Sequence, residues 1–163
     1  MSQKNPKPAI ISHDGCGCIV LLMCIIVMGA IALPSYLSMA NRARQSEAKQ
    51  YLSSMNKGQQ AYYAEKSAFS NSIPDLGLGI KTETPNYKYS LRVTKQAAFN
   101  YGVSKQKTEI SYVGGVFRVP VQDVQGTTAI LCKNDYPGTI EPAEPTYQNG
   151  KVICAKGTTE VTK

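Results

Sequence analysis

One uncharged stretch constrains this chain more than any other feature of its sequence. Residues 16–33, CGCIVLLMCIIVMGAIAL, hold no charged side chain and no Asn, Gln, Ser or Thr, and Pro34 follows them. A helix of that length reaches about 27 Å, close to the hydrocarbon thickness of a bilayer, and has no face for water. We therefore expect residues 15–34 to form a single transmembrane helix. A buried helix of a soluble protein is the alternative, but the rest of the chain offers little apolar surface to enclose it.

The residues before this stretch set the expected topology. Residues 1–14 are polar, with two prolines that oppose a helix, and we expect a cytoplasmic tail. The basic residues after the stretch slightly favour the opposite orientation, but so short a tail is easily left behind in the cytoplasm. A signal peptide is the competing interpretation, although its apolar region usually ends after about 7–15 residues. We expect a single-pass protein of the bacterial inner membrane, with its larger part in the periplasm or outside the cell.

Residues 35–69 continue the helix with a different character. They hold no proline and are rich in Ala, Gln, Glu, Lys and Met. Large apolar side chains recur there at helical spacing, as at Tyr51, Met55 and Tyr62, and charged residues occupy the predicted solvent-exposed face of the helix. We expect one long helix with a kink at Pro34, whose amphipathic half packs on the remainder of the chain.

Residues 70–163 are predicted to form a β-sheet head. A loop rich in Pro and Gly comes first, and alternating apolar residues then predict four strands, at residues 87–93, 97–103, 110–119 and 127–132. Gly114 and Gly115 in the third strand indicate a bulge or a close backbone approach. The predicted fold class is α+β, with a four-stranded antiparallel sheet laid on the amphipathic helix.

The five cysteines fall into two groups. Cys132 and Cys154 lie in the polar C-terminal region, at a spacing suited to closing a loop. If that region faces an oxidising compartment, we expect them to form a disulfide. Cys16 and Cys18 lie at the start of the uncharged stretch, too close together for a four-ligand zinc site, and their role stays open.

The composition argues against an enzyme. The only histidine is His13, in the predicted tail, so a Ser/His/Asp or Cys/His arrangement would lack its base. We expect no catalytic residue, no cofactor and no metal. A net charge of +7 leaves open a surface module that binds carbohydrate or DNA. Six basic residues along the first strands are its candidates: Lys81, Lys88, Arg92, Lys95, Lys105 and Lys107.

Three runs of sequence then carry a resemblance to a known family. These are AIALPSYL from Ala30, ANRARQSEAK from Ala40 and QQAYYAEK from Gln59. Together with the paired C-terminal cysteines, they resemble type IV pilins, and in particular the cyanobacterial pilin-like proteins of the G/H type. The resemblance implies a structural or accessory protein of a motility, adhesion or secretion machinery. Its partners would be the membrane, other pilin-like subunits and the pilus assembly machinery.

The chain departs from the family at the processing motif. The family is cut between Gly and Phe, and these positions fall on Ser12 and His13; the family's acidic residue of the mature helix falls on Gly17. In the family, this carboxylate pairs with the amino terminus that cleavage creates on a neighbouring subunit. A buried ion pair is favourable only when both partners are present. A chain that is not cleaved lacks the free amine, so the loss of the carboxylate is consistent with the loss of the cleavage motif. Two hypotheses remain: an anchored pilin-like protein, or a minor subunit of a filament. A major pilin is disfavoured.

Three small residues, Gly29, Ala30 and Ala32, form a candidate seam for helix association. Small side chains let the backbones of two helices approach closely in lipid. We predict that Gly29→Leu abolishes crosslinks between copies in native membranes, because the leucine side chain would hold the helices apart. Val20→Leu is the matched control. Unchanged crosslinks in Gly29→Leu would dismiss the seam.

Overall fold

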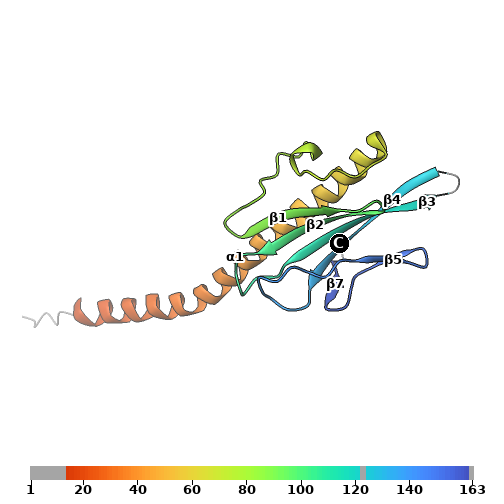
Figure 1. Ribbon diagram of the computed structural model, residues 1–163. Helices are drawn as coiled ribbons and strands as arrows, with labels where there is room; N and C mark the ends of the chain where they lie inside the picture. The colour runs from red at the N-terminus through yellow and green to blue at the C-terminus, as the bar shows by residue number, and fades with distance from the viewer. Residues whose placement is uncertain (1–13, 122–123, 162–163) are drawn as a thin grey trace, which may run out of the picture. The chain divides into compact units, whose positions relative to one another are not determined.

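The computed structural model describes residues 14–121 and 124–161. It begins with helix α1 (Asp14–Lys66), followed by the short 3-10 helix η1 (Pro74–Leu76) and seven strands (Figure 1). The chain divides into two compact units between Ala40 and Asn41, and α1 contributes to both. The finer division predicted at residues 14, 34 and 69 stays a prediction.

In the N-terminal unit, α1 runs through Pro34 without interruption. Its side chains at residues 19–28 are exposed, and the large apolar ones among them keep between 56% and 73% of their surface accessible. Across the described residues, no helix combines the length and the apolar character needed to cross a membrane. The predicted span at residues 15–34 is therefore not confirmed, and the kink at Pro34 stays a prediction.

Several predicted positions lie outside what the structure describes. Ser12 and His13 precede the described residues. The described side chains do not include those of Gly17, the candidate seam at Gly29, Ala30 and Ala32, or Pro34. The predictions made for these positions therefore rest on the sequence alone.

The C-terminal unit, residues 41–163, contains the sheet, and we call this unit the head. The strands of the main sheet are β1 (Tyr87–Val93), β2 (Ala97–Ser104), β3 (Tyr112–Val121), β4 (Val124–Asn134) and β7 (Thr158–Glu160). They lie in the order β1-β2-β3-β4-β7, and every neighbouring pair is antiparallel. Strands β5 (Thr146–Gln148) and β6 (Lys151–Ile153) form a separate hairpin.

The prediction of four strands is wrong, because the sheet has five. Strand β7 pairs with Cys132, Lys133 and Asn134 at the end of β4. It is only three residues long, and its sequence, TTE, offers no alternation of apolar and polar side chains. A strand this short and without alternation gives no side-chain pattern from which the sequence could predict it. The α+β class and the antiparallel sheet are confirmed.

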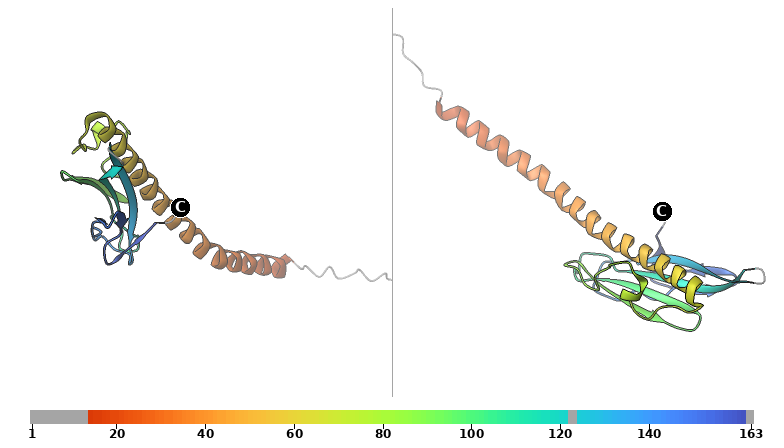
Figure 2. Two further views of the ribbon diagram at one scale, coloured as in Figure 1. Left: turned by 90° about the vertical axis from the view of Figure 1, so that its right-hand side faces the viewer. Right: turned by 90° about the horizontal axis from the view of Figure 1, so that it is seen from above.

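The amphipathic half of α1 lies across one face of the sheet (Figures 1 and 2). Alternation along β1 turns Tyr87 and Tyr89 toward the helix, where they are buried with Leu52 and Met55 of α1 and Tyr112 of β3. The tyrosine rings pack against one another, with centroids 6.2 Å apart between Tyr87 and Tyr89 and 6.5 Å apart between Tyr87 and Tyr112. This cluster attaches the helix to the sheet.

The other face of the sheet holds a second core. Phe99, Tyr101, Phe117 and Ile130 are buried there together with Cys132. Side chains of the β5–β6 hairpin cover this core, and Tyr147 stacks on Phe117 with ring centroids 6.4 Å apart. Both faces of the sheet are therefore covered, which explains why β2 is buried along nearly its whole length.

The predicted disulfide is confirmed. Cys132 and Cys154 are bonded and close a segment with a sequence separation of 22. Cys132 is fully buried in the second core, and Cys154 packs against it. The bond therefore ties the β5–β6 hairpin to the sheet that it covers.

We predict that the double substitution of Cys132 and Cys154 by Ser lowers the free energy of unfolding by about 3 kcal/mol, because the unfolded chain gains the freedom of the open loop. Urea unfolding of the detergent-solubilised chain, followed by near-ultraviolet circular dichroism, measures this. Cys24→Ser is the control, since Cys24 is an exposed free thiol. An unfolding midpoint that the double substitution leaves in place would contradict the prediction.

Candidate functional site

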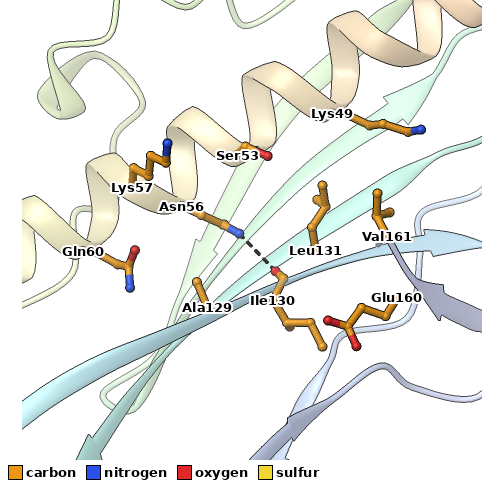
Figure 3. Close-up of a pocket in the computed structure, with 10 residues that line it drawn as sticks. All are labelled: Lys49, Ser53, Asn56, Lys57, Gln60, Ala129, Ile130, Leu131, Glu160 and Val161. Carbon is orange, nitrogen blue, oxygen red and sulfur yellow. Dashed lines mark hydrogen bonds between the residues drawn. The ribbon is translucent and has the colours of Figure 1, made fainter. Parts of the chain in front are cut away.

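One polar side chain of α1 enters the face of the sheet. Asn56 is buried, donates a hydrogen bond from Nδ2 to the carbonyl oxygen of Ile130 (3.0 Å), and accepts one at Oδ1 from Asn100 (2.8 Å) (Figure 3). The asparagine lies directly over Gly114, where a Cβ atom would come within 2.3 Å of Asn56 Oδ1. Glycine is therefore required at this position, because any side chain there would displace the asparagine.

The neighbouring glycine serves the other face. A Cβ atom on Gly115 would lie 2.6 Å from Pro145, which comes just before β5. The registers of β2 with β3 and of β3 with β4 run without a bulge across both glycines. Of the two expectations for Gly114 and Gly115, the close backbone approach is confirmed and the bulge is wrong. The pair lets a helix approach from one side and a proline from the other.

A second buried amide fixes the end of the helix. Gln59 donates a hydrogen bond to the Ser70 carbonyl oxygen (2.8 Å) and accepts one from the Ser70 N–H (3.0 Å). Both residues are buried. This two-way bond satisfies a backbone donor and acceptor beyond the end of α1, as buried polar groups require. It holds the loop that leads to η1 against the helix.

At the opposite end of the head, α1 contacts a buried carboxylate. Glu109 precedes β3 and is fully buried, with Arg44 and Gln45 of α1 each 3.5 Å from one of its oxygens. Burial, and then the charge of Glu109, raise the pKa of Tyr112 to about 12. Burial also raises the pKa of Tyr87 above its ordinary range. These contacts fix how α1 enters the head.

An ion pair holds the C-terminal segment to the outer face of the sheet. Arg92 of β1 forms a bidentate pair with Glu144, with 2.6 Å between Arg92 Nε and Glu144 Oε1, and Tyr101 donates its hydroxyl to the same carboxylate. The guanidinium also lies over the ring of Phe99, 5.1 Å from its centroid. Hydrogen bonding to Glu144 raises the pKa of Arg92, while burial raises that of Tyr101. The group positions the segment before β5.

Two open grooves border these contacts. The first has a volume of about 790 Å³ and lies between α1 and residues 129–131 of β4, next to β7 (Figure 3). Its lining residues are Lys49, Ser53, Asn56, Lys57, Gln60, Ala129, Ile130, Leu131, Glu160 and Val161. The second, about 660 Å³, lies beside the Arg92–Glu144 pair. The first includes Ser53 with Lys49 and Glu160, and the second includes Thr94 and Thr146 with Glu144, whose carboxylate is bound by Arg92 and Tyr101. The described residues contain no group of three His, Cys, Asp or Glu that could hold a metal.

The six basic residues considered for DNA do not gather on one surface. Lys105 pairs with Glu83 (2.6 Å between Nζ and Oε1), and Arg92 pairs with Glu144. Lys105 lies beyond the end of β2, whereas Lys95 lies in the turn between β1 and β2. Because β1 and β2 are antiparallel, these two lysines lie at opposite ends of the sheet. The arrangement offers no continuous basic strip for a nucleic-acid backbone.

The polar contacts just described were only partly predictable. Gly114 and Gly115 were identifiable because glycine is unfavourable inside a strand unless the backbone needs the space. Asn56, Gln59 and Glu109 had no such signal, because a polar residue in an amphipathic pattern is equally compatible with a solvent-exposed position. Their burial depends on which strands the helix covers.

Comparison with protein families identifies the chain as a pilin-like protein. Residues 45–155, more than two thirds of the chain, match the family described as "Type IV pilin-like G and H, putative". The chain belongs to this family. Searches among curated proteins and among solved structures each return no match. The matched region contains residues 45–66 of α1, strands β1 to β6 and the disulfide. The cyanobacterial origin stays a prediction.

We predict that Gly114→Ala lowers the free energy of unfolding by about 1–3 kcal/mol, because the new methyl group overlaps Asn56. In an Asn56→Ala background the same substitution should cost much less, so a double-mutant cycle in urea unfolding isolates the contact. Gly102→Ala is the control: its Cβ would meet Leu52 at 3.2 Å, a milder contact. Equal costs in the two backgrounds would refute the assignment.

We predict that stability falls as the pH rises from about 10 to about 12. The pKa of Tyr112 is raised in the folded state, so over this interval the unfolded chain loses the tyrosine proton first and is favoured. Urea unfolding across this interval, with absorbance titration of the tyrosines, measures the effect. Tyr87, Tyr89 and Tyr101, whose pKa values burial also raises, contribute to the same fall. Tyr112→Phe should therefore reduce the slope without removing it, and the exposed Tyr136→Phe should leave it unchanged. An equal slope in both variants would exclude a contribution from Tyr112.

Proposed function

We propose that the protein is a membrane-anchored, type IV pilin-like accessory protein that acts through association with other proteins. It is a pilus-associated component or a minor pilin of a motility, adhesion or secretion machinery. The family match over residues 45–155, which include the end of α1, strands β1 to β6 and the disulfide, is the observation that carries this proposal. Catalysis is not part of the proposed role, because the proposal rests on the pilin-like family match.

The proposed anchor is residues 15–34. The large apolar side chains described at residues 19–28 are exposed in the isolated chain. Exposed apolar surface of this kind is stable only against lipid or against other apolar helices. Both are available to a pilin-like protein, in the inner membrane and in the core of a filament. We propose that the N-terminus is cytoplasmic and the head periplasmic or extracellular, where the Cys132–Cys154 disulfide persists.

The sequence near the N-terminus favours an accessory role over that of a main filament subunit. Ser12 and His13 stand where the family's cleavage motif would lie, and Gly17 stands where it carries an acidic residue. A subunit that keeps its leader and lacks the carboxylate cannot form the buried ion pair with a neighbouring copy. A position in the membrane or at the end of a filament does not need that pair.

The test is the intact mass and N-terminal sequence of the native protein, from membranes and from sheared surface fibres. The expected result is a full-length chain found in membranes. A chain trimmed near residues 12–17 in sheared fibres would assign the minor-pilin role and remove the anchored accessory role. A chain found in neither fraction would overturn the proposed function.

A further inference from the structure

Among the described side chains of the head, the most exposed large apolar ones lie on one loop between β4 and β5. Tyr136 is 82% exposed and Ile140 is 72% exposed, whereas the next such residues in the head, Ile153 and Leu78, reach 44% and 37%. Residues 136–140, YPGTI, form what we call the basal loop. Exposure of a large aromatic and a large aliphatic side chain on five residues indicates an interaction surface.

The basal loop is held in place by the rest of the head. The N–H of Gly138 bonds to the Glu109 carbonyl oxygen (2.9 Å), and the Ser111 hydroxyl donates to the Gly138 carbonyl oxygen (3.0 Å). The Asn134 side chain donates to the Ile140 carbonyl oxygen (3.1 Å). Because its backbone is fixed in the middle and at the end, the loop presents Tyr136 and Ile140 outward instead of folding them against the protein.

The basal loop lies at the end of the head where α1 enters. Glu109, whose backbone bonds the loop, also contacts Arg44 through its side chain, and Arg44 is among the first residues of the head. Seven residues separate Leu33, the last residue of the uncharged stretch, from Asn41, the first of the head. Along the chain, this end of the head is therefore the part that follows most directly on the stretch that we propose as the anchor.

Some acidic groups near this end have partners. Glu109 is buried against Arg44, Glu83 forms an ion pair with Lys105, and Glu47 accepts hydrogen bonds from Asn86 and Tyr89. Asp135 and Glu141, which flank the loop, are exposed and form no ion pair within the described residues. On the basic side, Arg42 and Lys107 are exposed and form no ion pair within the described residues. Tyrosine, an aliphatic residue and unpaired cations are the groups that favour a membrane interface.

We propose that the basal loop inserts Tyr136 and Ile140 into the interfacial layer of the bilayer, with Lys107 and Arg42 beside the lipid phosphates. The tyrosine ring occupies the headgroup region and the isoleucine side chain reaches the start of the acyl chains. The contact fixes the orientation of the head on the membrane. This inference rests on the proposed membrane anchoring and adds to it a second, separate point of contact.

The test uses the full-length chain in vesicles of phosphatidylcholine and phosphatidylglycerol. The protein has no tryptophan, so Tyr136→Trp supplies a single probe at the loop. The expected result is a blue-shifted emission that is quenched when the lipids carry brominated acyl chains. Tyr62→Trp is the matched control, since Tyr62 lies near the other end of the α1 segment in the head, and its emission should be unaffected.

Each outcome separates the two proposals. Unmodified chain that fails to float with the vesicles would overturn the anchoring, and the inference with it. Chain that floats while the probe at residue 136 is unquenched would overturn the inference and leave the anchoring intact. A probe at residue 136 that is shielded from iodide in water yet unquenched by brominated lipid would assign the loop to a protein partner, which also overturns the inference.

A second variant checks that the probe reports the native contact. In Ile140→Ser with Tyr136→Trp, the emission should shift to the red and lose its quenching, because the aliphatic side chain no longer enters the acyl region. The unfolding midpoint should be unchanged, since the Ile140 side chain is exposed. Quenching that persists undiminished in this variant would overturn the role given to Ile140.

Discussion

The contact of Asn56 with Gly114 is the constraint on which the head depends. It places a polar side chain of α1 against the middle of the sheet, where only glycine leaves room, and the amide then joins Asn100 to the Ile130 carbonyl oxygen. A buried amide with two partners tolerates little sliding of the helix, because a shift would leave polar groups unsatisfied. The tyrosine cluster provides apolar contact between helix and sheet, and Asn56 fixes the position of the helix along the sheet.

The opposite face of the sheet repeats this arrangement with a loop in place of a helix. Pro145 occupies the space over Gly115, the Arg92–Glu144 pair holds the segment before β5, and the disulfide joins Cys154 to the core strand β4. A sheet covered on both faces is rigid, and its loops can then present groups to partners without moving. The fixed basal loop and the entry of α1 lie at the same end of this framework.

Prediction from sequence succeeded where a local pattern of residues is explained by one type of structure. The long helix, the alternating strand β1, the close approach at Gly114 and Gly115 and the disulfide were all expected. The lack of proline after Pro34, the period-two alternation and the paired cysteines each have a local cause. Strand β7 was missed because its three residues, which pair with the end of β4, show no alternation of apolar and polar side chains. The burial of Asn56, Gln59 and Glu109 was missed because polar residues give no sign of which partner will cover them.

The sequence by itself determined that one long helix precedes an antiparallel sheet closed by Cys132 and Cys154, since helix formation, strand alternation and thiol pairing depend on residue type and spacing. Only the tertiary structure decided that Glu144 would meet Arg92, that Glu109 would be buried beneath Arg44, and that Tyr136 and Ile140 would project beside the entry of α1. The partners of the two ion pairs are separated by many residues in the sequence. Their contacts exist only once the fold brings these distant segments together.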